Sequence, residues 1–381
     1  AGKAKAYGVE QIPTQIFLGP GGKELWRHVG FISKEVILKK WKELGYDFKP
    51  WRESKAIADG PSILRYIHET ATENDIDRHI RYSQRITKAS WSSNDACWTL
   101  DVLNTDTNER QSARCNVLLM CAGYYRYEKG HTPTFEGQER FGGDIIHPQH
   151  WPEDLDYRNK KIVVIGSGAT AVTLIPELAK QAAHVTMLQR SPTYVMSMPD
   201  RDIVANALRK ILPEKTAYAL TRWKNITLQQ WLYRRTRKNP QQVRRKLLKW
   251  VRKELGEDYD VNTHFTPTYN PWDERLCLVP NSDLFIAIRS GSASVVTDHI
   301  ERFTETGIKL KSGDELPADI IVTATGLDLL VLGEVEFVVD DRPVDFSQTY
   351  TYKGIMCSGV PNLVSTFGYI NASWTLRADL T

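Results

Sequence analysis

The stretch that decides the fold is residues 141–171, which reads F-G-G-D-I-I-H-P-Q-H-W-P, a short polar loop, and then K-I-V-V-I-G-S-G-A-T-A. The β-branched run 161–165 predicts a buried parallel strand, and the apolar spacing after Ala171 predicts a helix. Between them, Gly166 makes a tight turn, Gly168 lets a phosphate approach the backbone, and Ala171 lets helix and strand pack closely. The stretch therefore predicts the strand, turn and helix of a dinucleotide-binding fold.

A second apolar run, 185–188, ends at Gln189 and Arg190, about twenty residues after the glycine turn. An acidic residue at this place would bind a ribose 2′-hydroxyl, whereas an arginine suits a 2′-phosphate. The alternative is an ordinary solvated arginine. We interpret Arg190 as favouring NADP over NAD. The other expected NADP contacts are Ser167, Ala169, Thr170 and Ser191.

Composition bounds the class of protein. The 381 residues are enough for two or three domains, and 41% hydrophobic with 25% charged residues is ordinary for a soluble globular chain. No apolar run reaches membrane-spanning length and the first residues lack a signal-peptide core, so we expect a cytoplasmic protein. The five cysteines form no C-x-x-C pair and no metal spacing, and we expect no metal.

Residues 201–254 hold sixteen Lys and Arg against three acidic residues. Such a run usually forms the solvated face of helices, and we expect no nucleic-acid partner. The alternative is a weak contact with an anionic membrane surface. Apolar residues recur within it at helical spacing and predict the core of a helical insert rather than a substrate cage. They are Leu208, Ile211, Leu212, Trp223, Ile226, Leu228 and Trp231.

Five residues before the glycine turn carry a family resemblance: Phe141, Gly143, His147, Trp151 and Pro152, in the pattern F-x-G-x-x-x-H-x-x-x-W-P. This resembles the fingerprint of the Baeyer–Villiger monooxygenases, a branch of the class B flavoprotein monooxygenases. Residues 50–381 are similar in particular to the ethionamide-activating subgroup. The resemblance implies a Rossmann-like α/β flavoprotein with two dinucleotide-binding domains and a helical insert. It also implies that the fingerprint couples these domains.

The resemblance implies the activity as well. In this family NADPH reduces bound FAD, and O2 forms a flavin C4a-peroxide that transfers one oxygen atom to a ketone or to a sulfur- or nitrogen-containing small molecule. Arg275 occupies the place of the arginine that stabilises the peroxide and the nicotinamide, with Asp273 as its expected partner. The alternative for Arg275 is a surface salt bridge to Asp273 or Glu274. Ala324, Thr325 and Gly326 resemble the crossover motif that returns the chain to the flavin domain, and they are expected to contact NADP. Ala122, Gly123 and Tyr124 resemble the chain's return beneath the flavin.

These features predict the domain boundaries. A partial FAD domain and linker occupy 49–156, with strands expected at 79–82, 86–91, 98–102 and 115–121 and a helix at 62–73. The NADP domain occupies 157–200 and 276–325 on either side of the insert 201–275, and 326–381 returns to the FAD domain.

Residues 1–48 resemble the C-terminal half of a thioredoxin. A strand is expected from Ile12, Pro13 and Thr14, then a hairpin at G-P-G-G and a helix from Ser33. No C-x-x-C accompanies them, so we expect no disulfide exchange.

The sequence departs from the family at one point. The first strand and G-x-G-x-x-G of the flavin domain, and the G-G-T-W-like segment, are not found in these residues. We therefore expect half a flavin site, with FAD binding and activity open. Two alternatives follow: a catalytically silent NADP-binding fusion fragment, or a thioredoxin-fold redox or interaction protein. The sequence does not decide the substrate or the oligomeric state.

Overall fold

The computed structural model describes residues 49, 51–352 and 354–366, together with two earlier strands, β1 (Thr14–Leu18) and β2 (Glu24–Val29). The chain divides into two units, residues 1–54 with 59–79 and residues 55–58 with 80–381.

In the first unit, β1 and β2 pair antiparallel, with Thr14 opposite Val29 and Leu18 opposite Glu24. The predicted hairpin is confirmed. Pro13 and the helix predicted from Ser33 lie outside the described residues.

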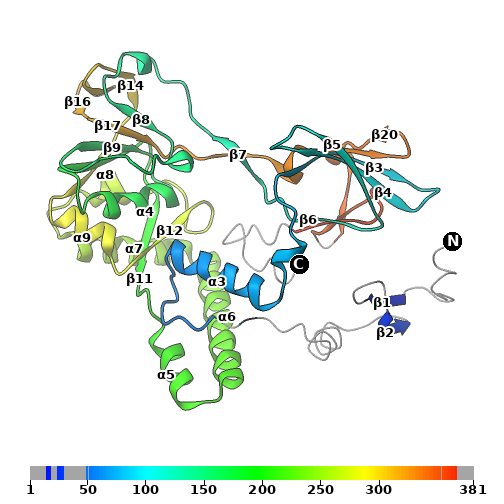
Figure 1. Cartoon of the computed structure of the whole chain (residues 1–381). Helices are drawn as coiled ribbons and strands as arrows, with labels where there is room; N and C mark the ends of the chain where they lie inside the picture. The colour runs from blue at the N-terminus through cyan, green and yellow to red at the C-terminus, as the bar shows by residue number, and fades with distance from the viewer. Residues whose placement is uncertain (1–13, 19–23, 30–48, 50, 353, 367–381) are drawn as a thin grey trace. The chain divides into compact units, whose positions relative to one another are not determined.

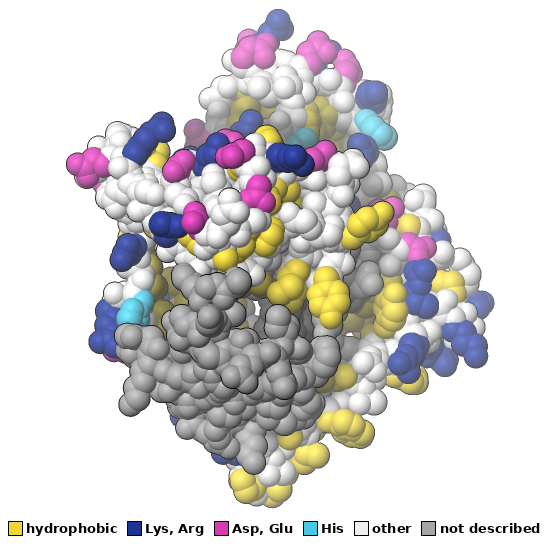
Figure 2. Space-filling model, turned by 90° about the vertical axis from the view of Figure 1, so that its right-hand side faces the viewer, with side chains coloured by type: hydrophobic (Ala, Val, Ile, Leu, Met, Phe, Trp, Pro, Cys, Tyr) yellow, Lys and Arg dark blue, Asp and Glu magenta, His cyan; other side chains and the backbone are white. Residues whose placement is uncertain are grey.

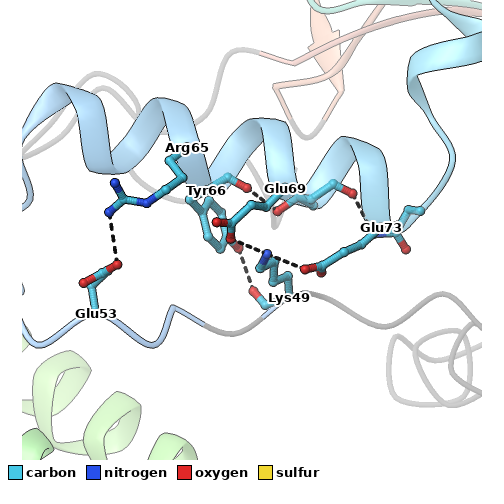
Figure 3. Close-up of polar contacts among 8 residues, drawn as sticks. Lys49, Glu53, Arg65, Tyr66, Glu69 and Glu73 are labelled. Atoms are coloured by element: carbon cyan, nitrogen blue, oxygen red, sulfur yellow. Dashed lines mark hydrogen bonds and ion pairs between the residues drawn. The ribbon is translucent and has the colours of Figure 1, made fainter.

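Helix α3 (Gly60–Glu73) confirms the helix predicted in the first unit, and it begins two residues earlier than expected because Asp59 caps it. The Lys49 ammonium lies between Glu69 and Glu73, 2.7 Å from each (Figure 3). The Tyr66 hydroxyl donates to the Lys49 carbonyl over 2.6 Å. The same residues line a pocket of about 230 Å³. The charged side chains drawn in Figure 3 pair with one another, so we assign this pocket no ligand.

The second unit contains the predicted dinucleotide sheet (Figure 1). Its five strands are parallel and stand in the order β13-β10-β9-β17-β8. They are β8 (Asp144–Ile146), β9 (Lys161–Ile165), β10 (His184–Gln189), β13 (Ala293–Thr297) and β17 (Ile320–Thr323). The predicted strand 161–165 is confirmed with both ends in place.

Both faces of this sheet are covered, which is why β9 is apolar without alternation. Ile162 and Val164 belong to the core formed with helices α4 (Ala169–Leu178), α7 (Pro240–Leu255) and α9 (Asp283–Arg289). Val163 and Ile165 face the other way, toward a three-stranded antiparallel sheet. That sheet consists of β14 (Ile300–Phe303), β15 (Gly307–Leu310) and β16 (Glu315–Pro317).

The helical insert leaves the NADP region after β11 (Tyr194–Met198) and returns at β12 (Leu276–Pro280), which pairs parallel with β11. Between them lie α5 (Ile203–Ile211), α6 (Glu214–Lys238), α7 and α8 (Val261–Phe265).

The predicted insert core is wrong for α5 and α6. Ile211 is 79% exposed, Trp223 68% and Trp231 57%, whereas α7 and α8 contribute Val251 and Phe265 to the core. Helical spacing predicted an apolar face but could not say what covers it.

The region assigned to the flavin domain contains a sheet in the order β20-β19-β3-β4-β5. Its strands are β3 (Gln84–Ser92), β4 (Cys97–Asn104), β5 (Arg110–Cys115), β19 (Glu336–Val339) and β20 (Arg342–Pro343). A separate parallel pair joins β6 (Leu118–Met120) to β23 (Leu363–Ser365). A short hairpin pairs β21 (Thr351–Tyr352) with β22 (Met356–Cys357).

Two strand predictions in this region need correction. Residues 79–82 form the end of a 3-10 helix (Asp77–His79) and a turn rather than a strand, because the chain turns toward Ser83, whose φ is 57°. Residues 115–121 divide between β5 and β6, which belong to different sheets.

Two connections join this region to the NADP region: β7 (Tyr125–Gly130) and β18 (Leu327–Leu329), which pair antiparallel (Figure 1).

Candidate functional site

The predicted glycine turn joins β9 to α4. Gly166 has φ 138°, and a Cβ atom there would lie 2.4 Å from the Ala324 carbonyl oxygen, so only glycine fits. Its N–H donates to the Leu188 carbonyl over 2.8 Å. Gly168 is the N-cap of α4, and Ala171 is fully buried where the helix packs. The turn thus presents the N-terminus of a helix, which favours an anionic group.

The end of β10 lies beside this turn. The Ser167 hydroxyl, at the turn, donates to the Ser191 carbonyl over 3.2 Å. Arg190, between β10 and Ser191, is exposed. The structure therefore brings the predicted 2′-phosphate residue next to the predicted phosphate-binding turn.

Sequence reasoning missed a buried hydrogen-bond network that includes Gln189, the residue directly before Arg190. The Gln189 amide donates to the His264 carbonyl and to the Thr297 hydroxyl, each over 2.8 Å, and the side chain of Gln189 is 2% exposed. His264 Nδ1 lies 2.9 Å from the same Thr297 oxygen, and burial lowers the pKa of His264. The three residues stand far apart in the sequence, which gave no local signal for their contact.

Arg275 also reaches the turn. Its Nη1 lies 3.8 Å from the position that a Cβ atom on Gly168 would occupy, and its side chain is exposed. Its carbonyl accepts a hydrogen bond of 2.8 Å from the Tyr269 hydroxyl. Among the described residues, Arg275 forms no ion pair. A guanidinium without a carboxylate partner at this turn is suited to bind phosphate oxygens.

The expected pairing of Asp273 with Arg275 is wrong. The Asp273 carboxylate instead accepts from Arg237 of α6 and, over 3.1 Å, from the Asn270 amide. These two hydrogen bonds, with that from Arg237 the larger cause, hold the pKa of Asp273 below its usual range.

Two tyrosines form the buried side of the Arg275 segment. The Tyr194 hydroxyl donates to the Tyr269 carbonyl over 2.8 Å, and the two rings meet edge to face at 5.4 Å. Burial raises the pKa of both phenols, and for Tyr269 the nearby Arg275 charge acts in the opposite direction. Both tyrosines therefore serve as neutral hydrogen-bonding groups at neutral pH.

The fingerprint histidine contacts the crossover motif. His147 Nε2 lies 3.0 Å from the Gly326 carbonyl oxygen, and Nδ1 accepts from the Gln149 N–H over 3.2 Å, so Nε2 carries the proton in this arrangement. A Cβ atom on Gly130 would lie 1.9 Å from the His147 ring. His147 thus packs against the end of β7 and forms a hydrogen bond with Gly326 of the crossover motif.

Neighbouring residues strengthen these contacts. The Gln149 amide donates to the carbonyls of Arg126 and Tyr127 in β7, and the Thr325 hydroxyl donates to the His131 carbonyl over 2.6 Å. The fingerprint segment, β7 and residues 324–326 form one hydrogen-bonded group.

The other fingerprint residues have packing positions. Phe141 is buried edge to face with Phe303 at 6.4 Å, and a Cβ atom on Gly143 would lie 2.1 Å from the Asp319 carbonyl oxygen. Trp151 is half-buried against Tyr157, and Pro152 is exposed.

The predicted flavin residues follow β6. Gly123 has φ 70°, and Tyr124 is buried, with its carbonyl accepting from the Leu330 N–H over 2.9 Å. Among the described residues β6 has one strand neighbour, β23, and Leu119 of β6 is 58% exposed. The residues present fit a dinucleotide at Gly166–Ala171. For FAD they offer the contacts predicted at 122–124, which stay a prediction.

Comparison with known proteins gives the class of this chain, that of the flavin-binding monooxygenases. The chain belongs to the flavin-binding monooxygenase-like family, whose sequence model matches residues 31–342. It is thus a member of a class of enzymes that uses NADPH and FAD, as the sequence predicted. The match begins ahead of the boundary predicted near residue 48.

Individual relatives support this assignment. The chain is 55% identical to the FAD-containing monooxygenase EthA of Mycobacterium tuberculosis (strain ATCC 25618 / H37Rv) over 361 residues, which cover 94% of this chain and 73% of EthA. It is 51% identical to the putative FAD-containing monooxygenase MymA of the same strain, over 94% of this chain and 72% of MymA.

Solved structures share the fold. An oxidized steroid monooxygenase bound to NADP is similar with a TM-score of 0.69 at 24% identity, over 87% of this chain and 71% of that chain. OTEMO in complex with FAD and NADP has a TM-score of 0.66 at 20% identity, over 86% and 70% of the two chains. These likenesses confirm the predicted Rossmann-like α/β architecture.

Proposed function

We propose that this chain binds NADPH at the glycine turn and acts in monooxygenation of a small molecule, in which one oxygen atom of O2 enters a ketone or a sulfur- or nitrogen-containing group. The observation that carries the proposal is the Arg275 guanidinium, which lies beside Gly168 without an ion-pair partner among the described residues. A cation at this place meets the negative charge of a dinucleotide and of reduced oxygen.

The chain's residues divide the binding of NADPH between them. The N–H groups at Gly168 and Ala169 receive the diphosphate, and Ala171 keeps α4 close to β9. Arg190, at the end of β10, pairs with the 2′-phosphate. Arg275, whose Nη1 lies beside Gly168, adds positive charge at the turn.

His147 has a coupling role in this proposal. Its hydrogen bond to Gly326 joins the NADP region to the strands that lead toward Gly123 and Tyr124. FAD, when bound and reduced by NADPH, supplies the oxygen-activating chemistry of the family. The chain's own contributions are to orient the nicotinamide, supply positive charge and fix the crossover beside the glycine turn.

The visible absorption spectrum of the purified chain, before and after addition of FAD, tests the proposal. A flavin spectrum that survives desalting and is bleached by NADPH would support monooxygenation by this polypeptide. Loss of all flavin, with NADPH still bound, would show that this polypeptide binds the dinucleotide without carrying out the flavin chemistry of the family.

That second outcome would favour an alternative, an NADP-binding module without catalysis. Its motivating observation is β6, which has a single strand neighbour among the described residues. The thioredoxin-fold alternative has only the β1–β2 hairpin in its favour.

We also propose an anionic membrane surface as a weak partner of the insert. In α5, Ile203 is 77% exposed, Val204 50% and Ile211 79%, all on one helical face. Figure 2 shows hydrophobic side chains at the lower end of the view, where α5 lies in Figure 1. The basic residues of 201–254 add charge attraction to this apolar face.

Sedimentation with vesicles tests this contact. We expect binding to phosphatidylglycerol vesicles and not to phosphatidylcholine vesicles, and weaker binding by Ile203→Ser/Ile211→Ser. Equal binding of both proteins would remove α5 from the contact. Among the described residues, no helix has the length and apolar character needed to cross a bilayer. A cytoplasmic location stays a prediction from the sequence.

A further inference from the structure

The segment that precedes Arg275 is held by side chains of α6 and α7. One oxygen of the Asp273 carboxylate accepts from Arg237 of α6, and the other accepts from the Asn270 amide over 3.1 Å. The side-chain Oδ1 of Asn270 accepts in turn from the Gln241 side-chain amide of α7 over 2.9 Å. Both oxygens of Asp273 are therefore engaged by groups other than Arg275.

A second contact reinforces the first. Trp272 has φ 72°, a left-handed conformation that a bulky residue keeps only where its surroundings impose it. Its ring meets Tyr233 of α6 edge to face at 6.2 Å. Tyr233 and Arg237 stand four residues apart on α6 and so share one face of the helix. The same helical face thus holds two successive residues of the segment.

This arrangement determines which charges Arg275 meets. Asp273 stands two residues before Arg275 and Glu274 one residue before it, so a carboxylate released from Arg237 would be a second acidic group close in sequence to the Arg275 guanidinium. With Arg237 in place, Asp273 is neutralised on the side of α6, and Arg275 forms no ion pair among the described residues. Its guanidinium lies instead beside Gly168.

We infer that Arg237 is a positioning residue that holds the Asp273 carboxylate away from Arg275, so that Arg275 faces the glycine turn and is available to the phosphates of NADPH. Arg237 acts through Arg275 and does not touch the dinucleotide. The inference rests on the proposed function, namely that NADPH binds at this turn.

Fluorescence titration of the purified chain with NADPH tests the inference and needs neither FAD nor turnover. Arg237→Ala should raise the Kd for NADPH about threefold to fivefold, the range of a partly exposed ion pair. Arg237→Ala/Asp273→Asn should bring it back to within about twofold of the wild type, because the competing carboxylate is gone. Asp273→Asn alone should bind about twofold more tightly.

Arg234→Ala is the matched control. Arg234 is an exposed residue of the same helix and forms no ion pair among the described residues, so this change removes the same charge without touching Asp273. It should alter the Kd for NADPH much less than Arg237→Ala does. Circular-dichroism melting of each variant shows that the compared proteins are folded.

Three outcomes separate the claims. A double variant as weak as Arg237→Ala would overturn the inference, since removal of the carboxylate would then bring no recovery. Weaker binding by Asp273→Asn alone, which is open to measurement even if Arg237→Ala does not fold, would also overturn it and leave Asp273 a structural anchor. Absence of NADPH binding by the folded wild-type chain would instead overturn the proposed function.

Discussion

Strands β9 and β6 lie in the predicted NADP and flavin regions of the same unit, and their surroundings differ. β9 has a parallel neighbour on each side and covered faces, and its fourth residue, Val164, is fully buried. β6 has one neighbour among the described residues, and Leu119 at its centre is 58% exposed. Both strands lead into a glycine, at Gly166 and Gly123. A strand followed by glycine can therefore stand in two different environments, one enclosed by neighbouring strands and helices and one with its central side chain exposed.

Substitution of Val164 and of Leu119 should give the largest difference. Val164→Asp would bury a carboxylate without a partner, and we expect a loss of more than about 4 kcal/mol of unfolding free energy. Leu119→Asp places its charge in solvent and should cost about 0.5 kcal/mol or less. Urea denaturation followed by circular dichroism compares them. Similar losses would show that β6 is as fully enclosed as β9.

The two glycines offer the next comparison. Gly166→Ala would place a Cβ atom 2.4 Å from the Ala324 oxygen, at φ 138°. We expect at least about tenfold weaker NADPH binding, because backbone must move at the phosphate-binding turn. Gly123→Ala meets nothing closer than the Tyr127 hydroxyl at 3.9 Å and should leave NADPH binding within about twofold. Isothermal titration calorimetry measures the Kd for NADPH of both variants. Equal effects on this Kd would show that NADPH does not bind at the Gly166 turn.

Substitution of Arg190 tests whether the predicted NADP region prefers NADPH to NADH. Arg190→Ala should raise the Kd for NADPH about tenfold and leave that for NADH within about twofold, because only NADPH has the 2′-phosphate. Competition with 2′,5′-ADP provides an independent measure. An equal loss for both dinucleotides would remove the assignment of Arg190 to the 2′-phosphate.

The smallest expected effect concerns pH. Burial lowers the pKa of His264 in the folded protein, so the unfolded chain binds more protons between the two pKa values. The stability contributed by neutral His264 is therefore present above the unfolded pKa, about 6.5, and declines as the pH falls below it. His264→Asn should show a smaller drop in melting temperature between pH 7.5 and 5.5 than the wild type. An identical drop in both proteins would exclude His264 as a source of acid sensitivity.

Local sequence signals predicted the elements that are complete within a short stretch. β9 is an apolar run followed directly by Gly166, a position where only glycine fits. The predicted ends of this strand match the structure. The run at 79–82 resembled a strand, but the chain turns there. The exposed Trp223 shows that spacing alone does not reveal which faces are covered.

The candidate site divides in the same way. Arg190 and Arg275 were predicted from their places in motifs, and the structure brings both to the glycine turn. The pairing of Arg237 with Asp273 spans 36 residues, and that of Gln189 with His264 spans 75. Contacts of this kind depend on how the insert packs, so the sequence predicted the wrong partner for Asp273.

Titration of the purified chain with NADPH, followed by nicotinamide fluorescence, tests the central claim most directly. The glycine turn, Arg190 and Arg275 are all present within one folded region. We therefore expect saturable binding that 2′,5′-ADP displaces, both with and without added FAD. A folded chain that shows no NADPH binding would contradict the claim that its dinucleotide site is complete.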